Sequence, residues 1–277
     1  MSEESNQPAD AGELPKQEDM EVHPHAHAHG SKKWKDYVSE FIMIFLAVTA
    51  GFFAETLREH ISDSRKEKEY MVSMLSDLRE DTAQIAEVTA SLFKNIRGQD
   101  SLILLLRNFK ATDSLNKLAY RYYLRYTIGV PQVLFNEGTI TQLTGSGNMR
   151  LIEDRAIADS IADYTTYVKV SKAQAGYYND QFKKCFDYST NLFDFTVARN
   201  PVREDMSRMI TGRLNLDHVQ LLRHDSLQRQ IYCNQLTMLQ SIITGYIMNL
   251  HYTKKKAAGL SALLIKKYKI QGNEKTH

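Results

Sequence analysis

Apolar residues recur along most of this chain at steps of three and four, the spacing of one face of an α-helix. Residues 41–54 form an uncharged stretch. No Pro or Gly interrupts residues 52–97, so one long helix is expected, ending near Gly98. Asp81 stands where its apolar stripe would have another apolar residue. The members of this heptad-like stripe are Met71, Met74, Leu78, Ile85, Val88, Leu92 and Ile96.

After this first helix the same spacing predicts further helices. One covers residues 101–127, and a short one covers 139–143, before a Gly145–Gly147 turn. A long helix follows Asp154, which we expect as its N-cap, and continues to about Val197.

A last long helix is predicted after Asn215, ending at the lysines near Lys254. We find no convincing alternating strand, and only Pro131 and Pro201 follow residue 24. The chain is therefore predicted to be all-α, with one N-terminal transmembrane helix continuous with an elongated, roughly four-helix soluble bundle. The apolar residues that share one face of the last helix are Leu236, Leu239, Ile243, Ile247 and Leu250.

The uncharged stretch is short for a membrane span. Its 14 residues cover only ~21 Å as a helix, against a hydrocarbon core of ~30 Å. Counting from Val38 to Leu57 gives twenty residues, but Glu40 and Glu55 then lie just inside the two ends. A spanning helix and a buried soluble helix therefore both fit.

A cleaved signal peptide is the third interpretation, with a cleavage site at Val48–Ala50. A long acidic leader is a poor start for such a peptide, whereas Trp34 and Tyr37 suit a membrane interface. We favour a transmembrane helix over residues 36–58.

One face of this segment carries small residues in the middle and charges at the ends. Ala47 and Gly51 form a small-xxx-small pair, which lets two helix backbones approach closely in lipid, although chance also produces such pairs. We interpret this face as a self-association seam and expect a homo-oligomer. The residues assigned to the membrane seam are Glu40, Ala47, Gly51, Ala54 and Glu55.

The two ends of the chain carry opposite charge, although the net charge is only +2. Residues 1–31 are polar and acidic, which favours a disordered tail. Alternating imidazoles at its end could chelate zinc or nickel, but a solvated tail is the simpler interpretation. These weak metal candidates are His23, His25, His27 and His29.

The C-terminal segment 257–277 is basic and includes an apolar run, Leu260–Ile265. If the long helices alternate up and down, the last one returns to the bilayer, where clustered lysines suit anionic lipid. A frayed soluble tail is the alternative. The domains are then 1–31, 36–58, 59–256 and 257–277. The lysines assigned to the lipid surface are Lys254, Lys255, Lys256, Lys266 and Lys267.

Catalytic motifs are not found. The chain has no His-Glu-x-x-His, no Gly-rich phosphate loop followed by Lys and no Gly-x-Ser-x-Gly, so we assign no catalytic residue, no cofactor and no enzyme activity. Asp77 and Asp81 could take a metal or proton, but a solvated or capping role is favoured. Cys185 and Cys233 are expected as free, buried thiols.

Tyrosines crowd two of the predicted helices. They could line a pocket for a small ligand, although such stripes more often form a bundle core with hydroxyls at the rim. The tyrosines concerned are Tyr120, Tyr122, Tyr123 and Tyr126 on one helix, and Tyr164, Tyr167, Tyr177 and Tyr178 on the other.

Two stretches resemble a family of uncharacterised single-pass bacterial membrane proteins with a helical soluble domain. The first is Glu40–Val48 with Gly51–Glu55, and the second runs from Thr139 through Leu143, Gly147–Met149, Leu151, Ile152 and Asp154 to Ile161 and Tyr164. The resemblance implies a helical, membrane-attached architecture and no assigned activity.

The sequence thus predicts a membrane-anchored interaction or sensory module of unknown ligand that self-associates and binds lipid. Its further partner is open between an unidentified protein and a small ligand. The alternative is a subunit of an oligomeric ion- or proton-conducting assembly, with Glu40 and Glu55 facing a common axis. The balanced charge argues against nucleic acid. We expect the bacterial inner membrane, with the soluble domain in the periplasm, although flanking charges do not decide the orientation.

Overall fold

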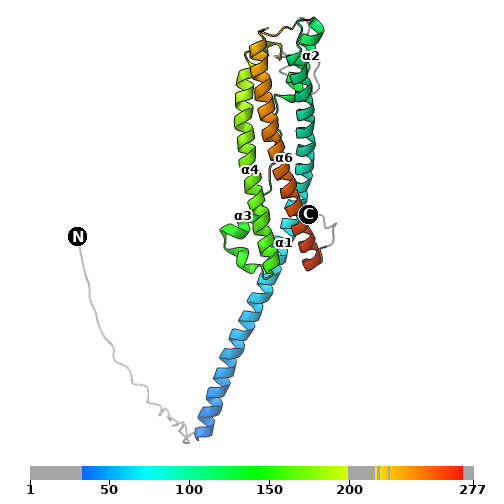
Figure 1. The fold of residues 1–277 in the computed structure, drawn as a ribbon. Coiled ribbons are helices and arrows are strands. Elements are labelled where there is room, and N and C mark those ends of the chain that lie inside the picture. Colours follow the sequence, from blue (N-terminus) through cyan, green and yellow to red (C-terminus); the bar gives the residue numbers. More distant parts are fainter. Residues whose placement is uncertain (1–32, 199–215, 217–218, 224, 271–277) are drawn as a thin grey trace, which may run out of the picture. The chain divides into compact units, whose positions relative to one another are not determined.

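The computed structural model describes residues 33–198, 216, 219–223 and 225–270, and no β-strand occurs within these ranges (Figure 1). The predicted all-α class is confirmed. Two compact units are formed: Met1–Arg58, the N-terminal unit, and Glu59–His277, the helical unit. The α-helices are α1 (Trp34–Arg107), α2 (Asp113–Tyr126), α3 (Gly138–Gly145), α4 (Arg155–Ser189) and α6 (Ser226–Tyr268), with 3₁₀ turns η1 (Asn148–Leu151) and η2 (Phe195–Ala198).

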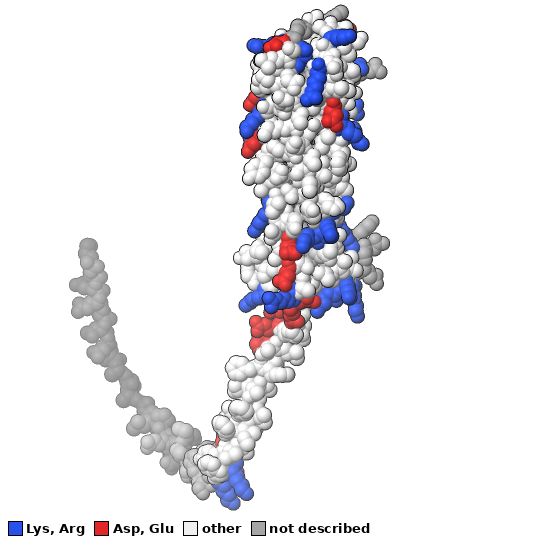
Figure 2. All heavy atoms as spheres, in the orientation of Figure 1, with Lys and Arg blue, Asp and Glu red and all other residues white. Residues whose placement is uncertain are grey.

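The described part of the N-terminal unit is the first third of α1. This helix is long and apolar enough in its first part to cross a membrane, and none of the apolar window is buried within the protein. Figure 2 shows mostly uncharged side chains along this part on the face in view. Large apolar side chains such as Phe41, Phe52 and Phe53 are about 70% exposed.

The helical unit is built on three long helices. α4 and α6 run antiparallel, because Gln181 near the end of α4 binds Gln235 near the start of α6, and Lys267 at the end of α6 pairs with Asp154. α6 is also antiparallel to α1: Gln240 donates to the Ile96 carbonyl (3.2 Å). α1 and α4 therefore run in the same direction (Figure 1).

Small residues let α4 and α6 approach closely. Ser171 and Thr253 are fully buried, and their hydroxyls are 2.9 Å apart. A Cβ atom at Gly245 would lie 3.1 Å from the Gln174 amide nitrogen of α4. Short side chains at a helix crossing reduce the distance between backbones, which explains the close approach of α4 and α6.

The first helix does not end near Gly98, as the sequence predicted, but continues to Arg107. Gly98 is a packing position: a Cβ atom there would lie 2.1 Å from Cγ of Tyr126. The glycine admits the aromatic ring of α2 against the backbone of α1, so tertiary contact replaces the helix stop. The connection to α2 lies at 108–112, where the Thr112 hydroxyl caps α2 by accepting from the Leu115 N–H (3.4 Å).

The described residues of the helical unit contain three long helices and the shorter α2, and the predicted helix over 101–127 is wrong in its boundaries. α2 folds back along α1, with the Tyr126 carbonyl accepting from Gln99 (3.0 Å). A non-helical connection, 127–137, then follows α1 as far as Thr139 of α3, which donates to Asp77 (2.6 Å). It thus descends beside about 22 residues of α1, or ~33 Å of helix, in place of a fourth helix.

Two further boundaries differ from the prediction. Asp154 caps α4 as expected, accepting from the N–H groups of Ala156 (3.0 Å) and Ile157 (3.4 Å), but α4 ends at Ser189 rather than near Val197. The last helix begins at Ser226, capped by Asp225, and runs past Lys254 to Tyr268.

The longer α6 changes the interpretation of the basic C-terminal segment. Ala257, Leu260 and Leu264 are at most 1% exposed, because they pack on Met71 and Met74 of α1. The helix therefore continues past Lys254 because its apolar face remains in the core. This part of the run Leu260–Ile265 lies in the core and is not free for lipid.

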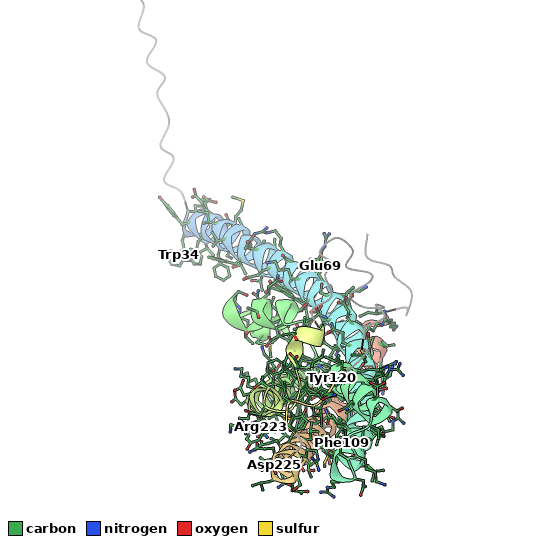
Figure 3. All side chains as sticks on the ribbon, turned by 90° about the horizontal axis from the view of Figure 1, so that it is seen from above. Trp34, Glu69, Phe109, Tyr120, Arg223 and Asp225 are labelled. Carbon is green, nitrogen blue, oxygen red and sulfur yellow. The ribbon has the colours of Figure 1, made fainter. Side chains whose placement is uncertain are left out.

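The core consists of two clusters along the three helices. One surrounds Met71–Leu78 of α1 with the start of α4 and the end of α6. The other surrounds Leu92–Leu106 with α2, the end of α4 and the start of α6. The predicted stripe on α1 faces these clusters, and the predicted face of α6 is likewise buried. Figure 3 labels four residues at the end of the helical unit that contains the second cluster: Phe109, Tyr120, Arg223 and Asp225.

Candidate functional site

The membrane seam residues all lie on the exposed first part of α1. A Cβ atom at Gly51 would meet nothing within 4 Å, so the small face of this helix is uncovered in the single chain. Near its end, Arg58 donates to Glu55 through Nε (2.9 Å) and Nη2 (2.5 Å). The seam thus presents a bare small-residue surface, ending in a neutralised charge pair.

The lysines assigned to a lipid surface fall into two groups on α6. Lys254–Lys256 lie in the middle of the helix, and Lys266 and Lys267 lie in its last turn, about 18 Å away along the axis. Two of the five have acidic partners: Lys256 with Asp163 (2.6 Å) and Lys267 with Asp154 (3.4 Å). A flat lipid surface perpendicular to α6 at its C-terminal end therefore does not contact all five lysines.

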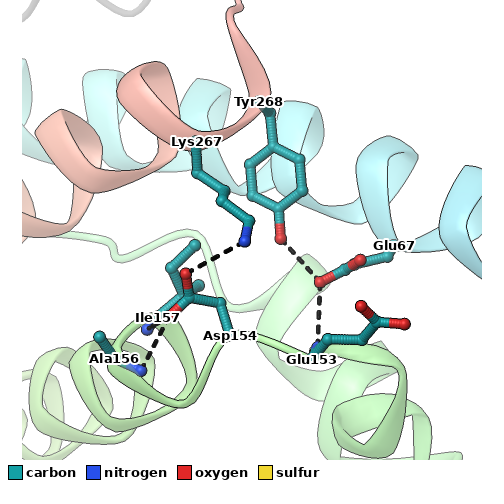
Figure 4. Close-up of polar contacts among 7 residues, drawn as sticks. All are labelled: Glu67, Glu153, Asp154, Ala156, Ile157, Lys267 and Tyr268. Carbon is teal, nitrogen blue, oxygen red and sulfur yellow. Dashed lines mark hydrogen bonds and ion pairs between the residues drawn. The ribbon is translucent and has the colours of Figure 1, made fainter.

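A polar latch, formed by Glu67, Tyr268, Asp154 and Lys267, fixes the end of α6 (Figure 4). The Tyr268 hydroxyl donates to Glu67 of α1 (2.7 Å), and the same carboxylate oxygen accepts from the Glu153 N–H (3.2 Å). Burial, followed by the hydrogen bond to Glu67, raises the pKa of Tyr268, so this hydroxyl stays protonated as a donor. The latch joins α1, α4 and α6 at one end of the helical unit.

The predicted metal site lies outside the described residues, since His23, His25, His27 and His29 precede residue 33. Among the residues that the structure describes, no group of three or more His, Cys, Asp or Glu side chains is placed to hold a metal ion. The structure thus brings no further ligands together for that tail.

Asp77 and Asp81 form a structural cluster. Asp81 is 0% exposed and accepts at Oδ1 from the N–H (2.9 Å) and side-chain amide (3.1 Å) of Asn136, and at Oδ2 from the Tyr164 hydroxyl. Burial raises the pKa of Asp81, against the lowering effect of these donors. The expectation of a solvated role is wrong for Asp81, which instead holds the connection 127–137 and α4 on α1.

Half of the eight tyrosines in the two predicted stripes are core: Tyr120, Tyr123, Tyr164 and Tyr178 are at most 1% exposed, whereas Tyr177 is 64% exposed. Tyr123 stacks on Phe193 with ring centroids 4.0 Å apart, and its hydroxyl lies 2.8 Å from that of Ser189. The Tyr120 hydroxyl donates to the Gln220 carbonyl (3.0 Å) and accepts from the Asp194 N–H (2.7 Å). The Tyr120 and Tyr123 hydroxyls therefore each have a protein partner, as buried phenols require.

Both thiols are free and buried, as the sequence predicted. Burial raises the pKa of Cys185 to about 12, and burial also raises the pKa of Cys233. The thiolate is the nucleophile, so neither cysteine is suited to nucleophilic chemistry.

An open groove lies between α1 and α6. It has a volume of about 620 Å³ and is lined almost entirely by apolar groups. Phe93 of α1 and Met248 and Tyr252 of α6 are 50%, 55% and 47% exposed around it. The residues that line it include Ala86, Ala90, Phe93, Met248, His251 and Lys254.

Sequence reasoning missed this groove because it followed the buried stripe of α1. A second stripe was present: Ala83, Ala86, Ala90 and Phe93 also follow steps of three and four, and all four are exposed. A helix with apolar residues on two sides has one face for the core and one left over. That signal could have indicated a surface for a partner.

We compared the chain with family models, with curated proteins and with solved structures, and none of the three comparisons found a match. The family resemblance therefore stays a prediction, and the functional argument rests on the geometry of the chain.

Proposed function

We propose that this chain is a single-pass protein of the bacterial inner membrane whose helical unit is an interaction module, held at the membrane and self-associating through the seam on α1. The observation that carries the proposal is the complete exposure of an apolar helix: no part of the apolar window of α1 is buried in the protein. Bare apolar surface of this length is stable only in lipid or against other apolar helices.

The flanks of the helix support the lipid environment. Trp34 and Tyr37 lie in its first turn and suit the interface, where ring and polar tip face different surroundings. Glu55, near the other end, is paired with Arg58, which lowers the cost of its charge near lipid. The seam supports self-association, because the space over Gly51 is open to a second helix.

The module function draws on the helical unit. Buried Asp81 and Tyr120 have hydrogen-bond partners within the protein, and burial makes the Cys185 thiol unsuited to nucleophilic attack, which favours a binding surface over a reactive site. The groove between α1 and α6 is the feature suited to binding, because exposed apolar side chains there surround an open volume.

The alternative, an ion-conducting assembly, depends on Glu40 and Glu55 facing a common axis. The contacts of Glu55 with Arg58 occupy both of its oxygens, which weakens that alternative. Proteoliposomes that contain the full chain provide its test: a proton or cation flux above that of empty liposomes would favour conduction over the interaction module.

Membrane attachment and its direction are testable together in intact cells. Single cysteines at Ser5 and at Ser226, an exposed residue at the start of α6, are labelled with a membrane-impermeant maleimide. The chain without an added cysteine is the control, because burial raises the pKa of both native thiols and should leave them unlabelled.

Labelling of position 226 alone, with the chain in the carbonate-washed membrane fraction, is the expected result and places the helical unit in the periplasm. Labelling of position 5 alone would keep the anchor and reverse the orientation. Recovery of the chain in the soluble fraction would refute the anchor.

A further inference from the structure

We propose that the α1–α6 groove binds an acidic amphipathic helix of a partner protein. The inference rests on the proposed function in that it names the partner class of the interaction module. It does not depend on the membrane anchor, because all the residues concerned belong to the helical unit.

The apolar character of the groove comes from both of its walls. Phe93, Met248 and Tyr252 keep about half of their surface in contact with solvent around a single hollow. Isolated exposed apolar residues are ordinary, but several around one concavity mark a surface that a partner covers. Burying such a cluster supplies the main favourable free energy of an interface.

The backbone of the walls favours a helical partner over an extended one. An extended peptide gains affinity from main-chain hydrogen bonds to an exposed strand edge. Both walls are continuous helices, α1 and α6, whose interior backbone groups are already paired. The backbone groups of a helix are paired within the helix, so a helical partner can bind this groove through side-chain contacts without leaving main-chain hydrogen bonds unmade.

The spacing along α1 fits such a helix. Ala83, Ala86, Ala90 and Phe93 are exposed in steps of three, four and three, over about 15 Å of helix. Small side chains let a second helix approach closely, and the Phe93 ring ends the row. A partner helix of about three turns with apolar residues at i, i+3 or i+4 and i+7 matches this length.

The charge around the groove selects an acidic partner. Lys254 of α6 lines the groove. On α1, exposed Lys94 and Arg97 follow Phe93, whereas Glu87 is the acid on the same stretch. Lys254, Lys94 and Arg97 have no ion-pair partner among the described residues, in contrast to Lys256 and Lys267. Unpaired bases beside an apolar groove attract acidic flanks and set orientation.

A peptide selection on the full chain in detergent micelles tests the inference. The displayed library keeps an apolar stripe of Leu, Ile, Phe or Met at helical spacing and varies every flanking position among Glu, Lys and Ala. We expect enrichment of Glu at the flanks. One selected peptide is then synthesised, and its Kd is measured by fluorescence anisotropy together with that of a Lys-flanked copy.

A matched pair of variants locates the binding site. Met248→Glu places a charge in the groove, whereas Met238→Glu changes an equally exposed methionine (58%) of the same helix that does not line it. Binding should weaken at least about tenfold for Met248→Glu and less than about twofold for Met238→Glu. Lys254→Glu should weaken the Glu-flanked peptide and strengthen the Lys-flanked one.

Lack of enrichment, enrichment of Lys flanks, or equal binding by the two methionine variants would overturn the proposal. Concentration-dependent association of the full chain that is lost in Met248→Glu, but not in Met238→Glu, would assign the groove to a second copy and overturn it as well. The anchor is judged separately: peptide binding by a chain that does not partition into membranes would refute the anchor and leave the groove assignment standing.

Discussion

At the scale of single residues, buried polar groups fix this fold more than exposed ones do. Asp81 is a carboxylate within the apolar stripe of α1, yet three donors from Asn136 and Tyr164 satisfy it. A buried acid without donors would lower the free energy of unfolding by about 3 kcal/mol, so its partners are as necessary as the acid itself. The residue converts an apparent fault in the pattern into the contact that positions the connection 127–137.

Substitution of Asp81 should separate its hydrogen bonds from its charge. Asp81→Ala leaves buried donors without an acceptor and should lower the free energy of unfolding by about 2–4 kcal/mol. Asp81→Asn keeps an oxygen for the Asn136 N–H and offers an amide to the Tyr164 oxygen, so it should cost less, about 1 kcal/mol at pH 7. Urea unfolding of the full chain in micelles, followed by circular dichroism, measures both.

Comparison of Asp81→Asn with the native chain predicts the sign of a pH dependence of stability. Burial raises the pKa of Asp81 above its ordinary value of 3.8, so between these two pKa values the folded chain binds more protons than the unfolded one. The contribution of this group is full below pH 3.8 and declines as pH rises through the folded pKa. Stability of Asp81→Asn relative to the native chain should therefore increase from pH 4 to pH 7. A difference independent of pH would contradict the raised pKa.

At the scale of elements, close contact between helices decides where they begin and end. Gly98 is of the residue type that commonly ends a helix, but α1 continues through it because the Tyr126 ring occupies the space where a side chain would stand. α6 similarly continues beyond Lys254, because Leu260 and Leu264 pack in the core. At Gly98, burial of apolar surface outweighs a local preference of ~1 kcal/mol.

Gly98→Ala tests this account of the α1–α2 contact. The added methyl group would overlap the Tyr126 ring, which has to move, and we expect a loss of about 1–3 kcal/mol in unfolding free energy despite the better helix propensity of Ala. The control is Gly176→Ala in α4, where a Cβ atom meets nothing within 4 Å, and a gain of up to about 1 kcal/mol is expected. Equal effects at the two glycines would show that the Tyr126 contact does not matter.

At the scale of the whole molecule, we propose two surfaces for other molecules among the described residues: the seam on the N-terminal unit and the groove on the helical unit. The seam lies on α1 in the N-terminal unit and the groove lies between α1 and α6 in the helical unit, and both combine small residues with exposed apolar ones. Separate variants can therefore change one without changing the other.

The seam variant is Gly51→Ile, which fills the open space over that glycine and should weaken self-association in lipid at least about tenfold, or ~1.4 kcal/mol. Thr49→Ile adds bulk about 200° away around the helix and should leave association nearly unchanged. Energy transfer between donor- and acceptor-labelled chains in liposomes, measured against dilution in lipid, gives both values. An unchanged dilution curve for Gly51→Ile would remove the seam as the contact.

The sequence by itself determined what depends on local pattern. Apolar spacing indicated the helices and their buried faces, Asp154 indicated the start of α4, and the uncharged run indicated a helix apolar enough to span a membrane. These features depend on one residue and its neighbours within a turn or two, so the amino-acid sequence alone is enough to predict them.

Only the tertiary structure decided what depends on distant partners. The partners of Asp81 are 55 and 83 residues away, the ring that fills the space at Gly98 belongs to another helix, and the groove needs α1 and α6 side by side. The physical reason is common to all three: the free energy of a buried charge, a close contact or a concavity is set by what faces it across space, and residue spacing along one helix does not specify that.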